Sequence, residues 1–144
     1  MRHFIALMIT VALTVNITSS CDSDDDHSTT TESSLIDGKW DVSNISGGFT
    51  GIHTDYKPGI ITWEFDSKKS QLTVVNNSAS TKNYSGLQSG QYTFSIFELK
   101  KAEYISIEGT EHGQIEHARD IIIINQNKKS TGSYSDHYIM TFRK

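Results

Sequence analysis

Two histidines with neighbouring glutamates are the residues of this chain that come closest to the pattern of a metal site. His112 and His117 lie five residues apart, next to Glu111 and Glu116. In a β-strand an odd spacing places two side chains on opposite faces, so this pair cannot share one ion unless a bulge intervenes. We therefore expect no metal site and interpret both histidines as solvent-facing residues beside a turn.

The sequence also shows no clear pattern for a catalytic nucleophile or for a phosphate-binding loop. Cys21 is the only cysteine, and it follows an apolar N-terminal segment. No glycine-rich loop leads from a strand into a helix, as phosphate-binding motifs require. We expect a protein without catalytic residues or a cofactor. A cluster of Glu111, His112 and Asp136 around a pocket would instead indicate a hydrolytic enzyme.

Aromatic side chains are better candidates for a binding site. Large rings in long polar loops are typical of recognition surfaces, whereas rings on the inward faces of strands are usually core. The rings in the predicted loops are Phe49, Tyr56, Tyr84 and Tyr134. Those on predicted inward faces are Trp63, Phe65, Tyr92, Phe94, Tyr138 and Phe142. The candidate ligand-binding residues are Phe49, Tyr56, Trp63, Tyr84, Tyr92, Phe94, Tyr134 and Tyr138.

The N-terminus has the pattern of a secretory signal peptide over residues 1–20. A basic start precedes an apolar run from Phe4 to Val15, and a small polar stretch ends at Ser20. The apolar run is too short to span a membrane, which takes ~20 residues. We therefore expect export rather than a transmembrane helix.

The lone cysteine directly after this segment needs its own explanation, because a single cysteine excludes an intramolecular disulfide. The run Thr18-Ser19-Ser20-Cys21 resembles the lipobox of bacterial lipoproteins. That resemblance implies that Cys21 is acylated and becomes the mature N-terminus, anchored to a membrane by its lipid. The alternative is an ordinary signal peptide followed by an unrelated cysteine.

Residues 21–34 read as the lipidated cysteine and a disordered acidic tether, since no large apolar residue occurs before Leu35. The tract Asp22, Ser23, Asp24, Asp25 and Asp26 resembles the lipoprotein export signal. The resemblance implies transfer to the outer membrane and display at the cell surface. The alternative is a plain solvated linker.

The net charge of the remaining domain limits the classes of partner that it can bind. With the tether and signal set aside, residues 35–144 balance 12 acidic against 12 basic residues. A neutral domain lacks the basic footprint of a nucleic-acid-binding protein. We expect a membrane contact through the lipid, and a small ligand or an envelope protein as partner.

Short runs of β-branched and aromatic residues separated by turn residues predict an all-β domain over residues 35–144. Several runs alternate between polar and apolar residues, which indicates one buried face. The run Ile121 to Ile124 does not alternate, so we expect it to be covered on both faces or to lie in an interface. The predicted strands are Gly38–Ser46, Ile60–Asp66, Gln71–Asn76, Gln91–Leu99, Glu103–Glu108, Gly113–His117, Asp120–Gln126 and His137–Arg143.

Loop lengths predict two unlike ends. In an up-and-down arrangement successive connections fall at opposite ends of the sheet. The connections near Ser67–Ser70, Lys100–Ala102 and Ala118–Arg119 are tight and charged, whereas three of the four alternate ones are long. We expect a closed end of tight turns and an open end of long loops where binding occurs.

A family resemblance supports a barrel. Gly38-Lys39-Trp40 resembles the Gly-x-Trp motif that begins the first lipocalin strand, and Arg143 resembles the basic residue that packs on that tryptophan. The resemblance implies a small eight-stranded up-and-down antiparallel barrel, lipocalin-like, with Gly38, Trp40 and Arg143 as structural residues. The alternative is a β-sandwich with a tryptophan in its core.

Taken together, these features predict a non-enzymatic lipoprotein at the cell surface that binds a small apolar molecule, a glycan or a protein through the long-loop end. The main alternative is a protein-interaction scaffold of the cell envelope without a ligand cavity. A roomy cavity lined by Trp63, Tyr92 and Phe94 would favour the ligand carrier. A packed interior would favour the scaffold.

Overall fold

The computed structural model describes residues 33–79 and 84–144 of the 144-residue chain. The predicted signal peptide, Cys21 and the acidic tract Asp22 to Asp26 lie outside the described residues. The described part begins with a short 3-10 helix, η1 (Ser33–Ile36), and continues as strands joined by turns and loops. The prediction of an all-β domain is confirmed.

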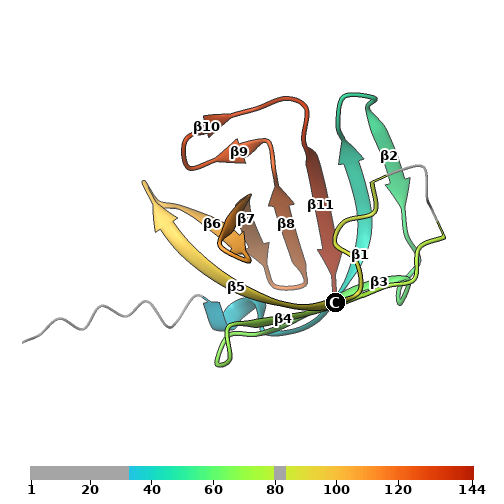
Figure 1. The fold of residues 1–144 in the computed structure, drawn as a ribbon, viewed down its shortest axis with the longest axis horizontal. Helices are drawn as coiled ribbons and strands as arrows, with labels where there is room; N and C mark the ends of the chain where they lie inside the picture. Colours follow the sequence, from blue (N-terminus) through green and yellow to red (C-terminus); the bar gives the residue numbers. More distant parts are fainter. Residues whose placement is uncertain (1–32, 80–83) are drawn as a thin grey trace, which may run out of the picture.

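Eight antiparallel strands close into a barrel, as predicted (Figure 1). Each strand pairs with its neighbours in the order given, and the last pairs with the first to close the barrel. The alternative of an open sandwich is therefore set aside. The barrel strands are β1 (Gly38–Gly47), β3 (Ile61–Asp66), β4 (Gln71–Asn76), β5 (Gly90–Leu99), β6 (Ala102–Ile107), β7 (Thr110–Ala118), β8 (Ile121–Asn125) and β11 (Tyr138–Arg143).

Three further strands lie in loops that the sequence predicted as irregular. β2 (Ile52–Asp55) forms a hairpin with the second half of β1, where Asn44 pairs with Asp55 and Gly47 with Ile52. β9 (Lys128–Lys129) and β10 (Gly132–Ser133) form a small separate ribbon between β8 and β11. Pairs this short have little hydrophobic periodicity, which is why the pattern of the sequence missed them.

The long strands β1 and β5 make the corners of the barrel. β5 pairs with β4 along Gly90–Thr93 and with β6 along Phe94–Leu99, so it changes partner at its centre. β1 pairs with β3 near its start and with β2 near its end, while β11 lies along its other edge. A long strand shared between two curved parts of a sheet is a common way to turn a barrel corner.

The isoleucine run of β8 alternates in burial after all. Ile122 and Ile124 are fully buried in the core, whereas Ile121 and Ile123 are only half-buried on the outer face. β8 pairs with β7 on one side and β11 on the other. Isoleucine is favoured on both faces of such a strand, so the run needs no further layer of protein over its outer face.

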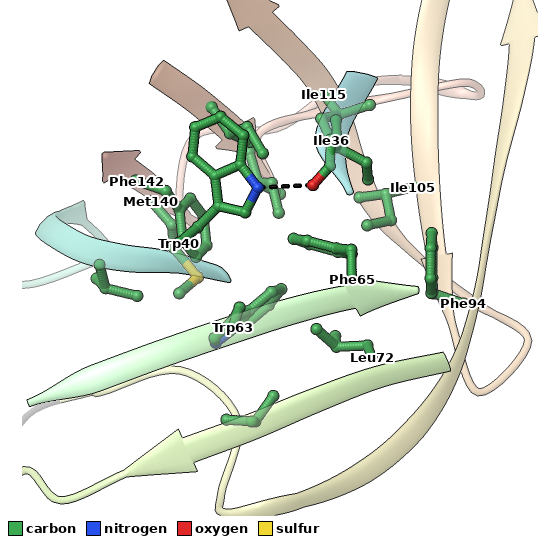
Figure 2. Packing of buried hydrophobic residues seen from close by; sticks show 14 of the residues in the cluster. Ile36, Trp40, Trp63, Phe65, Leu72, Phe94, Ile105, Ile115, Met140 and Phe142 are labelled. Carbon is green, nitrogen blue, oxygen red and sulfur yellow. Dashed lines mark hydrogen bonds between the residues drawn. The ribbon is translucent and has the colours of Figure 1, made fainter. Parts of the chain in front are cut away.

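The closed end is sealed by η1 and the first tryptophan (Figure 2). The Trp40 indole N–H donates a 2.6 Å hydrogen bond to the Ile36 carbonyl, and both residues are buried. Ile36 lies close to Ile105 and Ile115, so the short helix extends the core below the strands. Trp40 is therefore the buried end of the barrel, as its motif implied.

The cation beside this tryptophan comes from the neighbour of the predicted residue. The Lys144 ammonium lies 4.5 Å from the centroid of the Trp40 ring. Arg143, predicted for this role, is exposed. Because Met140 and Phe142 of the same strand point inward, alternation directs Arg143 outward. The stacking prediction was wrong by one residue.

Candidate functional site: the open end of the barrel

The inward aromatic residues form core rather than the lining of an open pocket. Trp63 and Phe94 are 1% and 6% exposed, and Figure 2 shows both inside the barrel. The Trp63 ring lies 5.0 Å from Phe142, and Phe65 lies 5.2 Å from Phe94 in an edge-to-face arrangement. Such tilted aromatic pairs are typical of packed interiors. Of the predicted binding residues, Trp63 and Phe94 are thus structural.

The long loop between β4 and β5 packs across the open end. The Asn76 side-chain amide donates hydrogen bonds to the carbonyls of Ser85 and Leu87, at 3.0 and 2.8 Å. A Cβ atom added at Gly86 would lie 3.0 Å from the Met140 methyl group, and Met140 is fully buried. The segment Ser85–Leu87 therefore covers the core at this end.

Three tyrosines from the predicted ligand-binding set are held at this end of the barrel, one from a predicted loop and two from predicted inward faces. The Tyr84 and Tyr138 rings stack with centroids 4.0 Å apart, and Gln126 donates a 3.0 Å hydrogen bond to the Tyr84 hydroxyl. Burial raises the pKa of Tyr84. Tyr92, also half-buried, donates its hydroxyl hydrogen bond to the Gln88 carbonyl at 2.9 Å. These three rings therefore contribute to the packing of this end and leave little exposed surface for a ligand.

Tyr56 is also packed against the core. Its ring is partly buried, and its hydroxyl is buried without a hydrogen-bond partner among the described residues. Burial raises the pKa of this hydroxyl. Tyr56 therefore contributes to the packing of the core and is not among the exposed candidate rings.

Two predicted rings remain exposed, and the fold brings them to neighbouring loops. Phe49, at the tip of the β1–β2 hairpin, is 90% exposed, and Tyr134, beside the β9–β10 ribbon, is 51% exposed. The Gly48 N–H donates a 2.9 Å hydrogen bond to the carbonyl of His137, whose ring lies 5.6 Å from the Tyr134 ring. We call Phe49, Tyr134 and His137 the aromatic rim.

The loops that carry the rim are held by backbone contacts. Asn127 accepts from the His137 N–H at 2.9 Å through its side-chain oxygen, and its carbonyl accepts from the Tyr134 N–H at 2.6 Å. Gly48 lies under the Tyr138 ring, where an added Cβ would be 2.5 Å from a ring carbon. The rim is thus presented in one arrangement. Sequence reasoning missed His137, because only the tertiary structure brings its backbone to Gly48, the residue before Phe49.

The predicted histidines stand apart from each other. The His117 Nε2 atom lies 3.1 Å from a Glu103 carboxylate oxygen, and both side chains are partly buried. His112 lies at a bulge of β7, where the register with β6 shifts. Burial, together with Lys129, lowers the pKa of His112. Among the described residues, no group of three or more histidine, cysteine or acidic side chains is placed to hold a metal ion.

The acidic residues that the sequence associated with His112 are engaged elsewhere. Glu111 accepts hydrogen bonds from the Ser130 backbone and hydroxyl, at 2.7 and 2.6 Å. Asp136 accepts from the hydroxyl of the adjacent Ser135. This arrangement ties the β9–β10 ribbon to β7 rather than surrounding a pocket.

A shallow pocket of about 160 Å³ lies on the outer wall, where β5 passes the β3–β4 turn. Most residues around it are of polar types, and several of them pair with one another: Gln71 with Gln91, and Thr93 with Glu108. Ligand pockets usually exceed roughly 300 Å³, so this hollow is too small to suggest a carrier of apolar ligands.

Comparison of the chain with protein-family models, curated proteins and solved structures found no match. Within residues 33–79 and 84–144, no helix is long and apolar enough to cross a membrane.

Proposed function

We propose that this protein is a lipid-anchored protein of the bacterial envelope whose barrel is a rigid scaffold for a protein-binding surface, the aromatic rim. The observation that carries the proposal is the exposure of Phe49 and Tyr134 on adjoining, hydrogen-bonded loops. The packing of Trp63 and Phe94 into the core supports a scaffold over a carrier.

The chemistry of the rim suits a protein partner. Exposing a large ring to water is unfavourable, and such rings often become the anchors of an interface. Phe49 projects from a hairpin tip, so it can enter a pocket on a partner, while Tyr134 and His137 add hydrogen-bonding groups beside it. Because the loops are already held in place, binding costs little ordering entropy.

The anchor in this proposal is the lipid on Cys21, supported by the resemblance of Thr18 to Cys21 to a lipobox. The tract Asp22 to Asp26 supports display on the outside of the outer membrane. The chain enters β1 at the closed end, and the rim lies at the open end (Figure 1). With the anchor attached there, the rim points away from the membrane, toward partners outside the cell.

Site-specific photo-crosslinking on cells tests this function. A photoreactive phenylalanine at position 49, and separately at 134, should give the same discrete protein adduct. Position 75 is the matched control, because Val75 is 42% exposed on the outer wall, away from the rim. The Tyr134→Ser variant should weaken the adduct formed from position 49, while the melting temperature stays nearly unchanged.

Three results would contradict the proposal: no adduct from either rim position, an equal adduct from position 75, or a large loss of stability in Tyr134→Ser. Native mass spectrometry of the purified mature protein separates the rival functions. A co-purifying small apolar molecule or glycan would favour a ligand carrier over a protein-binding scaffold.

A further inference from the structure

The second half of β5 has a strand partner on one edge only. Near its start the strand pairs with β4, and from Phe94 to Leu99 it pairs with β6 along its other edge. The last contact on the β4 side is the 2.9 Å hydrogen bond from the Phe94 N–H to the Ser70 carbonyl. β5 continues past this point to the tip of the β5–β6 hairpin (Figure 1). Among the described residues, no strand covers the β4-side edge from Ser95 to Leu99.

The backbone groups that face this open edge can be identified from the contacts around Phe94. The Thr93 carbonyl accepts a hydrogen bond from the Glu108 N–H on the β6 side, whereas the Phe94 N–H faces the β4 side. Successive residues of a strand direct their N–H and C=O groups to alternate edges. The groups of Ile96 and Glu98 therefore face the open edge. Within residues 33–79 and 84–144, no hydrogen bond from a loop or a side chain reaches them.

The outer face of this edge is apolar. Phe97 and Leu99 are 38% and 42% exposed, and the Phe97 ring stacks on Tyr104 of β6 with centroids 5.5 Å apart. Proteins usually protect an open edge with lysine, proline or a bulge, because its unpaired backbone groups attract a further strand. The stretch from Ser95 to Leu99 contains neither lysine nor proline, and its register with β6 is regular.

The inner face of the edge carries an acidic residue. Glu98 lies directly opposite Glu103 across the β5–β6 pair, so the two carboxylates share a face. Glu103 lies beside His117, whereas among the described residues no ion pair joins the exposed Glu98 to any cation, including Lys100 and Lys101 of the adjacent turn. Like charges directly opposite each other are unfavourable, and a positive charge beside them offsets the repulsion.

Two occupants from this protein itself fit the edge poorly. The tether, residues 21–34, has no large apolar residue to cover Phe97, and it is acidic like Glu98. A second copy paired edge to edge around Phe97 would bring its hairpin tip beside Phe94, where the β3–β4 turn already lies. An extended segment of another protein has neither conflict.

We propose that the β5 edge from Ser95 to Leu99 binds an extended segment of a partner protein as an added strand. The main chain of the segment pairs with Ile96 and Glu98. Its side chains alternate, so that an apolar residue lies beside Phe97 and a lysine or arginine lies beside Glu98. In Figure 1 the tip of the β5–β6 hairpin and the β1–β2 hairpin of the aromatic rim lie on opposite sides of the molecule, so this interface is separate from the rim.

Amide hydrogen exchange measured by NMR tests the added strand. The protein is the chain from position 21 onward with Cys21→Ala, and the probe is a short capped peptide of alternating valine and lysine. The peptide should slow exchange at Ile96 and Glu98, whose N–H groups face the open edge. Exchange at Ser95 and Phe97 should stay as it is, because their N–H groups already face β6. A peptide with glutamate in place of lysine should bind about fivefold more weakly.

Two variants at one position separate the charge from the backbone. Glu98→Gln removes only the carboxylate, and peptide binding should fall about fivefold. Glu98→Pro also removes the N–H at the open edge, where a strand tolerates proline, and binding should fall about fivefold further. The matched control is Glu64→Gln on β3, because Glu64 is exposed on a strand with partners on both edges. This control should bind the peptide like the wild type.

A second pair of peptides tests the main-chain pairing without changing the protein. N-methylation of one alternate set of peptide residues should abolish binding, and methylation of the other set should not, because a paired strand uses the amides of one edge. Equal effects of the two methylations, no slowing at millimolar peptide, or an equal loss in Glu64→Gln would overturn the proposal. Slow exchange at Ile96 and Glu98 without peptide would also overturn it, since the tether or a second copy would then occupy the edge.

Discussion

At the scale of single residues, Trp40 makes several of the contacts that close the barrel. Trp40 is 1% exposed, its N–H is satisfied by Ile36, and the Lys144 ammonium lies over its ring. The contact of a cation with an indole contributes about 0.5–2 kcal/mol, less than the burial of the ring itself. Burial of the Trp40 ring therefore contributes more to stability than its contact with the Lys144 ammonium.

Replacing Trp40 with alanine should destabilise the domain by about 3–5 kcal/mol, because a large cavity would form and the Ile36 carbonyl would lose its donor. Total stabilities of domains are ~5–15 kcal/mol, so the variant should be close to unfolding at physiological temperature. Urea denaturation followed by circular dichroism measures the change. The Arg143→Ala variant is the control and should cost under about 1 kcal/mol, since Arg143 is exposed. A Trp40→Ala midpoint close to wild type would contradict the role of Trp40.

His112 makes stability depend on pH. Its folded pKa is lowered by burial and by Lys129, so the folded state binds a proton less readily than the unfolded state. The unfolded chain takes up this proton as the pH falls through about 6.5, the ordinary value for histidine. The free energy of unfolding should therefore decrease below that pH.

The His112→Asn variant should lose less stability than the wild type between pH 7 and pH 5. The measurement is urea denaturation at both values, with the difference compared between the two proteins. Carboxylates contribute equally to both and cancel. His53→Asn is the matched control, because it removes an exposed histidine instead of the partly buried one. Identical pH profiles for wild type and His112→Asn would show that His112 is not the group responsible.

Among the elements, the β5–β6 hairpin stores backbone strain. Its two turn residues, Lys100 and Lys101, both have positive φ, at 54° and 67°. Two-residue turns with positive φ at both positions match the twist of the strands, but they favour asparagine and glycine over lysine. The strands around them, with Phe97 stacked on Tyr104, hold the turn in this conformation.

Lys100→Asn with Lys101→Gly should raise the free energy of unfolding by about 1–2 kcal/mol, because each left-handed lysine carries a steric cost that the new residues avoid. The midpoint of urea denaturation gives the change. Lys68→Asn is the control: Lys68 is not among the residues with positive φ, so its replacement should be nearly neutral. A double variant less stable than wild type would show that the lysines make contacts that outweigh the strain.

At the β7 bulge, by contrast, a positive φ is occupied by glycine, the residue that adopts it without strain. Gly113 has φ of 132°, and an added Cβ would lie 2.3 Å from the Asn125 carbonyl oxygen. The close approach of β7 and β8 at this point requires the absence of a side chain. The bulge also gives His112 its partly buried position.

At the scale of the whole molecule, the two ends of the barrel have different chemistry. The closed end is sealed by η1 and Trp40, and it receives the chain that leads from the proposed anchor. The open end carries the aromatic rim. The proposed arrangement, with the anchor and the binding surface at opposite ends of the barrel, suits capture from outside better than extraction of lipid from the home bilayer.

The anchoring itself gives the last prediction. Cys21→Ala should abolish acyl labelling and release most of the protein from the membrane fraction, because the multiple acyl chains of a lipoprotein hold far more firmly than a protein contact. Replacing Asp24, Asp25 and Asp26 with alanine should reduce protease access on intact cells while acylation continues. Full membrane retention of Cys21→Ala, resistant to high salt, would contradict the lipid anchor. Unchanged digestion of the second variant would reduce the acidic tract to a linker.

The sequence by itself determined the fold class and the eight barrel strands, because alternation of polar and apolar residues records which face of each strand is buried. It also identified Trp40 as a structural residue, and Trp40 is buried. The tertiary structure decided which rings are free. Tyr56 and Tyr84 lie in predicted loops just as Phe49 and Tyr134 do, yet the first two pack against the core and are partly buried. A loop residue's exposure depends on contacts with distant strands, which leave no periodic signal in the local sequence. For the same reason Lys144 took the place predicted for Arg143, since the side on which a cation meets Trp40 is set by the register of β11 with β1.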